Sequence, residues 1–239
     1  FQEWLEVTRF LFKEPVVLVL SLLKSGLAVA GGIMTLIPLM ASQVLSKPAM
    51  LSLGIGILYS ARGLGAALGP LLVKRLFGET STVLHWSIAA SFFLKAGSYL
   101  FIANSENLWT LSFGVAAATL FGSIIWVFSS ALIHLSTPDR YLGRVFSFEL
   151  AVMTLVMGIS NWGVGFAVDG LGLTFNQVAL WMAALVILPG LFWTGFLTFV
   201  RKKLQQGDCV GSICPIDPSG FNPLPLVHEG QIEKKVQEK

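Results

Sequence analysis

The sequence predicts an all-α membrane protein with six transmembrane helices. Three observations support this fold class: six separate apolar stretches, their uniform length, and the distribution of Lys and Arg among the loops between them. Each stretch is about 21–25 residues long, close to the ~20 residues that cross ~30 Å of hydrocarbon at 1.5 Å per residue. The stretches are Val16–Leu39, Met50–Leu72, Val83–Ala103, Leu108–Leu132, Val145–Ala167 and Val178–Val200.

The loop cations sort onto alternate sides of these stretches. If the segment ahead of Val16 is cytoplasmic, the opposite side carries only Lys47. The cytoplasmic side then carries Arg9, Lys13, Lys74, Arg75, Arg140, Arg144, Arg201, Lys202 and Lys203. Because cytoplasmic loops are enriched in Lys and Arg, this asymmetry predicts that both chain ends are cytoplasmic. We therefore expect a multi-pass protein of the inner or plasma membrane.

The composition excludes several other classes of protein. Hydrophobic residues make up 54% and charged residues 12% of the chain, against about 25% charged in a soluble domain. A transmembrane β-barrel is excluded because its strands are ~10 residues of alternating polarity. The net charge of +3 comes from short clusters beside the spans, and no nucleic-acid-binding motif accompanies it.

Each span has features of its own. The first span carries Gly31, Gly32 and Pro38, which weaken a helix and favour either a hinge or a tolerated kink. The sixth span carries Pro189, which has the same two interpretations. The second and fourth spans each carry small residues at helical spacing, a pattern that favours close helix packing in lipid. The row in the second span is Ala61, Gly65 and Gly69, followed by Pro70. The row in the fourth span is Gly114, Ala118 and Gly122. The third and fifth spans are defined by their apolar length.

The chain divides into three regions. Residues 1–15 alternate apolar and charged side chains, which indicates an amphipathic helix on the cytoplasmic surface. Residues 16–200 form the six-helix transmembrane region, and residues 201–239, with four prolines after Lys203, are expected to be a disordered cytoplasmic tail. The loops are too short to form a domain, so the activity is expected among the spans. The chain opens on Phe1 rather than Met, which suggests that residues have been removed upstream.

The motifs do not indicate an enzyme. The sequence contains no G-x-S-x-G, no H-E-x-x-H and no pair of carboxylates within a span. His85 and His134 lie toward span ends, where a polar imidazole is easily accommodated. We expect no catalytic residue, no metal and no cofactor.

Three cations inside the spans are the most informative residues. Lys24 lies roughly 12 Å into the first span, and Arg62 and Lys95 lie nearer the middle of theirs. Each costs about 2.5–3.5 kcal/mol at a helix centre, so such residues normally face a cavity or a partner. Glu149, one turn into the fifth span, and Asp169, just beyond its end, look poorly placed to neutralise them. The alternatives are an anionic substrate, carboxylates from elsewhere, water, or side chains that snorkel or cap a carbonyl.

Further polar residues are candidates for a transport pathway. A small, polar stripe in the first span (Ser21, Lys24, Ala28, Gly31 and Thr35) suits a water-filled pathway better than lipid. Together with Lys24 and Arg62, the candidate pathway residues are Tyr59, Trp126, Ser130 and Asn161.

Two stretches resemble a known family. Residues 137–147, with the sequence TPDRYLGRVFS, and residues 36–75, with GAALGP beginning at Gly65, carry the likeness. They resemble the C-terminal half of a major facilitator superfamily transporter, in particular the bacterial drug and siderophore exporters that include the enterobactin exporter-like and macrolide-efflux groups. The likeness covers about residues 1–200.

The resemblance implies twelve helices in two halves, each half being a 3+3 inverted repeat. This chain would supply one half, a missing N-terminal half would be its partner, and Phe1 would lie in the central loop. The first, second, fourth and fifth spans would line the cavity, and the absent half would supply the carboxylates for proton coupling. The gating-loop candidates are Gly69, Lys74, Arg75, Arg140, Arg144 and Glu149. The usual Asp-Arg after the glycine is missing here, which weakens a salt-bridge latch at Lys74 and Arg75.

The expected function is therefore secondary active transport. The substrate would be a small amphipathic or anionic molecule, exported by proton-coupled alternating access. The expected partners are this substrate, the lipid bilayer and the missing half, with no nucleic acid. Two other functions stay open: a polytopic scaffold or assembly protein that transports nothing, and a passive channel.

Overall fold

The structure, a computed structural model, describes residues 10–45, 50–78 and 80–205. Within these ranges every regular element is a helix. The elements are α2 (Pro15–Val29), the 3₁₀ helix η1 (Gly31–Leu36), α3 (Ile37–Val44), α4 (Leu51–Phe77), α5 (Ser81–Ala103), α6 (Leu108–Ser136), α7 (Asp139–Asp169) and α8 (Phe175–Gln205).

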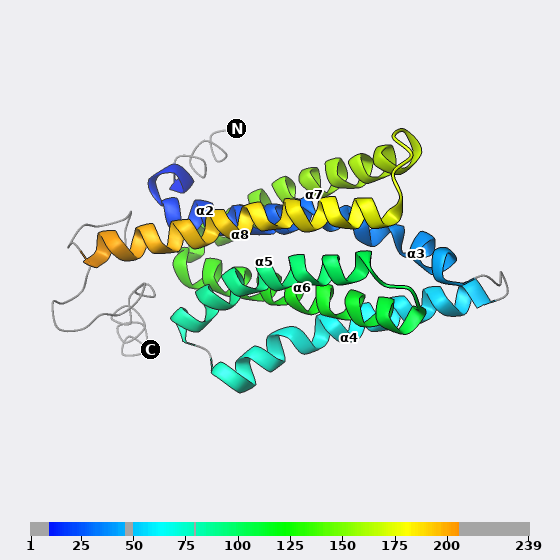
Figure 1. Cartoon of the computed structure of the whole chain (residues 1–239). Helices are drawn as coiled ribbons and strands as arrows, with labels where there is room; N and C mark the ends of the chain where they lie inside the picture. The colour runs from blue at the N-terminus through cyan, green and yellow to red at the C-terminus, as the bar shows by residue number, and fades with distance from the viewer. Residues whose placement is uncertain (1–9, 46–49, 79, 206–239) are drawn as a thin grey trace.

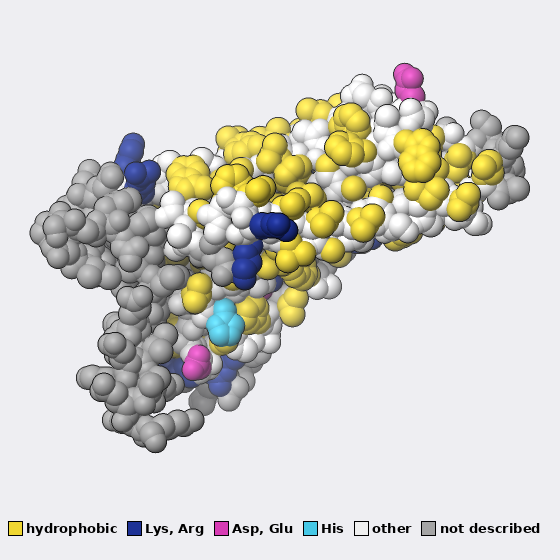
Figure 2. Space-filling view, turned by 90° about the horizontal axis from the view of Figure 1, so that it is seen from below, with side chains coloured by type: hydrophobic (Ala, Val, Ile, Leu, Met, Phe, Trp, Pro, Cys, Tyr) yellow, Lys and Arg dark blue, Asp and Glu magenta, His cyan; other side chains and the backbone are white. Residues whose placement is uncertain are grey.

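Within the described residues, six helices are long and apolar enough to cross a membrane, as the sequence predicts. The first of them is the composite of α2, η1 and α3, and the others are α4 to α8. Successive helices run in opposite directions, so the start of α2 and α7 and the end of α4, α6 and α8 lie at one end of the bundle (Figure 1). We call this the basic end, because Lys13, Lys74, Arg75, Arg140, Arg144, Arg201, Lys202 and Lys203 lie there. In Figure 2 most of the visible Lys and Arg side chains lie toward this end, and yellow apolar side chains cover much of the rest.

The first span is broken near its middle. α2 ends at Val29, and Ala30 leaves the helix with φ −103° and ψ 16° before the 3₁₀ turn begins at Gly31. Two neighbouring helices bond the backbone of the break: the Tyr99 hydroxyl donates to the Ala30 carbonyl at 2.9 Å, and the Ser160 hydroxyl donates to the Val29 carbonyl at 2.7 Å. The Gly32 amide in turn donates to Ser160 Oγ at 3.1 Å. Glycine thus breaks the helix, and side chains satisfy the backbone groups that the break frees.

The helices lie side by side along one long direction in Figure 1. The most extensive pairings are α4 with α6, α5 with α6, α5 with α8, and α2 with α7; α2 also contacts α6 and α8. Small residues make the α4–α6 contact, as the spacing predicts. A Cβ added at Gly65 would clash with the Ala116 carbonyl, and one at Gly69 with the Leu120 carbonyl, so both glycines let the backbones approach closely.

The second row of small residues, on α6, faces other helices. A Cβ at Gly114 would lie 2.6 Å from the Ile102 side chain of α5, and one at Gly122 would lie 3.1 Å from Lys95 Nζ. Both rows of small residues are therefore packing surfaces within the bundle.

The regions next to the spans are described in part. Residues 10–13 are helical, and the Phe10 ring stacks on the Tyr141 ring with 4.5 Å between centroids, but the first nine residues of the predicted amphipathic helix lie outside the described residues. α8 continues to Gln205, so the first five residues that we assigned to the tail are helical. The rest of the predicted tail lies outside the described residues, as does Lys47.

Candidate functional site

A buried ion pair joins α2 to α7. Lys24 Nζ lies 3.0 Å from Glu149 Oε2, and the two side chains are 3% and 0% exposed. Removing one partner of such a pair leaves an uncompensated buried charge, which costs about 3–5 kcal/mol. The pair is therefore a link between these two helices that is costly to break.

The geometry of the two helices explains why these residues meet. α2 and α7 run parallel from the basic end, and they pack along one another. Lys24 is nine residues after Pro15 and Glu149 is ten residues after Asp139, so both lie about 14–15 Å from their helix starts. Because side chains tilt toward the N-terminus of a helix, both groups also lean toward the same end of the bundle.

A third helix completes the surroundings of the Lys24 ammonium. Lys24 Nζ donates to Ser130 Oγ on α6 at 2.6 Å, and it lies 4.7 Å from the centroid of the Trp126 ring. The Phe146 ring of α7 lies at 5.7 Å. The ammonium thus has a carboxylate, a hydroxyl and aromatic faces around it, each of which favours a cation. We call Lys24, Glu149, Ser130 and Trp126 the charged cluster.

The charged cluster reaches the surface of the six helices through Trp126 and Ser130. The Trp126 side chain is 39% exposed and Ser130 is half-buried, whereas Lys24 and Glu149 are buried. Glu149 Oε1 has no hydrogen-bond partner among the described residues. A ligand that contacts the exposed face of Trp126 would be separated from the buried Lys24–Glu149 pair by one residue. In that pair Glu149 Oε1 is available as a hydrogen-bond acceptor.

The cluster corrects two sequence expectations. Glu149 is well placed to neutralise Lys24, so the partner of Lys24 lies within this chain; a role of Glu149 in gating stays a prediction. The expectation failed because depth was counted from Val145, whereas α7 begins at Asp139. The predicted polar stripe is also partly wrong: Ser21, Lys24 and Ala28 are buried inside the bundle, and only Thr35 at its far end is exposed.

Arg62 and Tyr59 form a separate pair on α4. The Arg62 guanidinium lies 6.0 Å from the centroid of the Tyr59 ring, and both side chains are exposed on the six-helix bundle. Asn161 lies apart from both groups, twelve residues beyond Glu149 on α7, with its buried Oδ1 unbonded among the described residues. Of the six predicted pathway residues, the structure thus unites Lys24, Trp126 and Ser130 only.

Lys95 is buried in the bundle and contacts no acid among the described residues. Its ammonium donates to the Ala118 carbonyl on α6 at 3.1 Å and lies 5.1 Å from the Tyr99 ring centroid. α5 and α6 run antiparallel from a short loop, which places these two positions at similar depth. Lys95 therefore caps a carbonyl, one of the alternatives that the sequence left open.

The remaining gating-loop candidates lie at the basic end. Lys74 and Arg75 are exposed in the last turn of α4, where cations complement the helix dipole. The Arg140 guanidinium lies 4.4 Å from the Tyr141 ring centroid, and Arg144 is half-buried one helical turn further along α7. Gly69, by contrast, is buried against α6 and serves packing.

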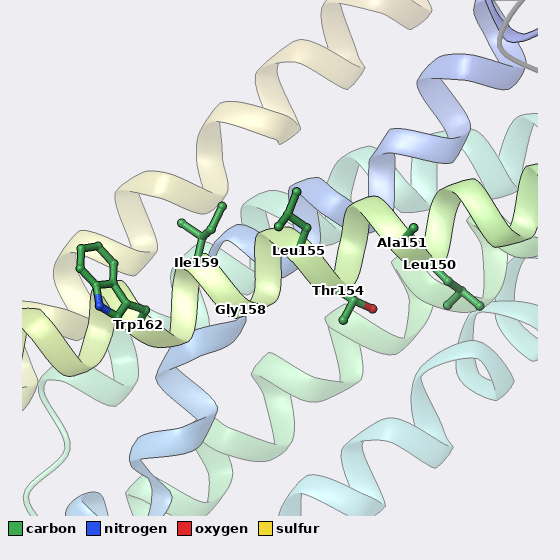
Figure 3. Close-up of a pocket in the computed structure, with 7 residues that line it drawn as sticks. All are labelled: Leu150, Ala151, Thr154, Leu155, Gly158, Ile159 and Trp162. Carbon is green, nitrogen blue, oxygen red and sulfur yellow. The ribbon is translucent and has the colours of Figure 1, made fainter. Parts of the chain in front are cut away.

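α7 presents an open apolar face away from the charged cluster. A shallow groove follows this face, and Figure 3 shows its lining side chains projecting from one helix. Its lining residues are Leu150, Ala151, Thr154, Leu155, Gly158, Ile159 and Trp162. Thr154 is the one hydroxyl side chain in this set, so the groove suits lipid or an apolar helix and offers no site for chemistry.

The described residues contain no group of three or more His, Cys, Asp or Glu side chains that could hold a metal ion. Comparison with other proteins finds no match for this chain among family models, curated proteins or solved structures. The described residues thus form an all-helical protein whose six long apolar helices are candidate membrane spans, as in a multi-pass membrane protein.

Proposed function

We propose that this chain is one half of a secondary active transporter, an exporter of small amphipathic or anionic molecules that works by proton-coupled alternating access. The observation that carries the proposal is the Lys24–Glu149 pair, which joins two spans inside the apolar region. Ionisable groups inside a membrane are costly and commonly mark the path of a substrate or a proton. A scaffold has no need of a charged group there.

The pairing of the helices supports the inverted repeat of the major facilitator superfamily. If α2, α4 and α5 correspond to α6, α7 and α8, the contact of α2 with α7 corresponds to that of α6 with α4. The contact of α5 with α6 then corresponds to that of α8 with α2. The α5–α8 and α2–α6 contacts each join two corresponding helices, so the two-fold relation leaves them unchanged. Six contacts thus obey one two-fold relation, as two repeats of opposite topology require.

The broken first span is a second support. Transporters commonly build their sites from discontinuous helices near the middle of the membrane. Here the break begins at Ala30, six residues after Lys24 and about 9 Å from it along the helix axis. A hinge at this point would let α2 move against α7 and so strain the Lys24–Glu149 pair.

Proton coupling rests on Glu149. Among the described acids it is the one that lies away from helix ends, so this half supplies a carboxylate that we expected from the absent half. A proton taken up by Glu149 removes its negative charge and leaves the Lys24 ammonium without a counter-charge. The Lys24 ammonium then attracts an anionic group of a substrate at the exposed Trp126 face. Proton uptake by Glu149 is thereby coupled to substrate binding.

The test is transport by the full-length protein in proteoliposomes with an imposed pH gradient. The probes are the amphipathic dye ethidium and the anionic dye carboxyfluorescein. We expect saturable, gradient-dependent export of at least one dye, and its loss in Glu149→Gln and Lys24→Gln. The matched control is Asp169→Asn, which removes an exposed acid at the far end of α7.

Three results contradict the proposal. Undiminished export by both variants removes the charged cluster from the mechanism. Flux that ignores the pH gradient and does not saturate indicates a channel. No flux of either dye, with wild-type folding, favours the scaffold.

A further inference from the structure

α4 and α5 follow one another in the chain, but they do not pack extensively on each other. Both helices pack on α6, and among the described residues no extensive pairing joins α4 to α5 directly. In Figure 1 the basic end of α4 slopes away from α5 and α6. Pro70 lies inside α4 just before its last turns, and an internal proline removes a backbone hydrogen bond and commonly bends a helix. The last turns of α4 are thus held apart from α5.

A groove of about 470 Å³ lies between these two helices. α4 lines it with residues between positions 69 and 77, α5 with residues between 83 and 94, and α6 with Leu120, Phe121 and Ile124. Its volume falls within the ~300–1,000 Å³ of pockets that hold small molecules. None of the lining residues is charged, so the groove favours an apolar occupant.

The groove extends through about half of the membrane. It begins at the basic end beside Phe77 and Val83, and it reaches Gly69 on α4 and Leu94 on α5. Leu94 is eleven residues after Val83, which is about 16 Å of helix, and one leaflet supplies about half of the ~30 Å hydrocarbon core. At Gly69 the backbone of α4 meets the Leu120 carbonyl of α6. This length fits an acyl chain of one leaflet, whereas a partner helix that crosses the membrane needs about twice as much.

The mouth of the groove has the composition of a membrane interface. Trp86 lines the groove and is 41% exposed, and Phe77 is 67% exposed; amphipathic Trp rings are enriched at the level of the lipid headgroups. Lys74 and Arg75 are exposed in the last turn of α4. The loop that follows contains one acid, Glu79, which lies outside the described residues. The last turn of α4 and this loop together are therefore net positive.

We propose that this groove binds an acyl chain of an anionic phospholipid, whose headgroup lies against Lys74 and Arg75. The chain gains stability by leaving its methylene groups in contact with apolar side chains. The two cations attract the headgroup, as basic pockets between membrane helices do at a cytoplasmic surface. The groove shares no residue with the charged cluster, so the site exists whether or not the chain transports anything.

The test is lipid binding to the purified full-length protein in detergent, measured by native mass spectrometry. Dioleoylphosphatidylglycerol and dioleoylphosphatidylcholine are titrated separately, because they share their acyl chains and differ in headgroup charge. We expect the wild type to bind its first phosphatidylglycerol about tenfold more tightly than its first phosphatidylcholine, since two cations face the headgroup.

A double variant tests the charges. Lys74→Gln, Arg75→Gln removes both cations and leaves the groove intact, so it should bind the two lipids equally. The matched control is Lys202→Gln, Lys203→Gln, which removes two cations from the last turn of α8. This control should keep the preference for phosphatidylglycerol. Sodium phosphate offers an anion without a chain, and it should not displace phosphatidylglycerol from the wild type.

Ala90→Phe tests the groove itself. Ala90 is exposed and lines the groove, so the larger ring takes the place of the chain while both cations stay. It should weaken the first binding event of both lipids by about tenfold or more, because the loss of two buried methylene groups is enough for that. The control is Ala184→Phe, at an exposed position of α8 outside the groove, and it should bind as the wild type does.

Four results would overturn the inference. The first is equal affinity of the wild type for the two lipids. The second is an equal loss of preference in the α4 and α8 double variants, which indicates a general attraction to the basic end. The third is wild-type binding by Ala90→Phe, which indicates that the groove has another occupant, such as a segment of another polypeptide. The fourth is displacement by sodium phosphate. All substituted positions lie on the surface of the six helices or at a helix end, and unfolding temperatures in detergent check that the variants fold.

Discussion

Lys24 and Glu149 are 125 positions apart in the sequence and 3.0 Å apart in the structure. They meet because two parallel helices place them at equal depth. The pair has consequences for stability that do not depend on transport.

We predict that breaking the pair destabilises the protein more than removing it. Glu149→Gln leaves Lys24 buried and unpaired, and it should lower the free energy of unfolding by about 3–5 kcal/mol. The double variant Lys24→Met, Glu149→Leu should come within about 1 kcal/mol of the wild type or exceed it, because two apolar side chains need no counter-charge. Reversible unfolding in mixed micelles measures both. A double variant less stable than Glu149→Gln would falsify this account.

The glycines of α4 give a second prediction. Gly65→Ala and Gly69→Ala place a Cβ against backbone carbonyls of α6, and each should cost about 1–3 kcal/mol through overpacking. Gly63→Ala is the control, since nothing lies within 4 Å of its Cβ position. Unfolding of the full-length protein in detergent should show loss for the first two variants only. Equal stability of all three variants contradicts the close α4–α6 approach.

The break in the first span gives a third prediction. Ser160→Ala removes the bond to the Val29 carbonyl and leaves the Gly32 amide without its acceptor. We expect a loss of about 0.6–1.7 kcal/mol, between the average and the maximum measured for hydrogen bonds between membrane helices, and faster amide exchange at residues 30–36. Ser147→Ala, whose hydroxyl bonds within its own helix, is the control. Unchanged exchange at the break in Ser160→Ala would show that Ser160 does not hold it.

The loop charges give a prediction of topology. In a variant without Cys209 and Cys214, a cysteine at position 75 should resist a membrane-impermeant maleimide in intact cells. A cysteine at position 106, in the loop before α6, should react. Permeabilised cells supply the control, because both positions are exposed in the structure and should then react. The reverse pattern would invert the proposed orientation.

The helices themselves were predictable because hydrocarbon imposes simple rules. A span needs about 20 apolar residues, and the six stretches were found with the correct number and place. The weak point at Gly31 was also visible, since glycine lowers helix stability wherever it stands. The spacing of Gly65 and Gly69 predicted a close contact, although it did not identify α6 as the partner.

The charged cluster was only partly predictable. Lys24, Trp126 and Ser130 were chosen as polar residues within apolar stretches, which is a local property. Glu149 was judged to be poorly placed to neutralise Lys24, because the sequence shows neither where α7 begins nor which helix lies beside it. Phe146 carried no signal at all, since one phenylalanine among 18 is distinguished only by its neighbours.

The sequence by itself determined that the chain holds six stretches long and apolar enough to cross a membrane, which loops are basic and that three cations lie within the stretches, because apolar length and charge are read along the chain. The tertiary structure decided which of these cations has a partner. A buried charge is compensated through space, so packing α2 beside α7 gave Lys24 the carboxylate of Glu149. The packing of α5 against α6 placed the Lys95 ammonium against the Ala118 carbonyl, with no acidic partner among the described residues.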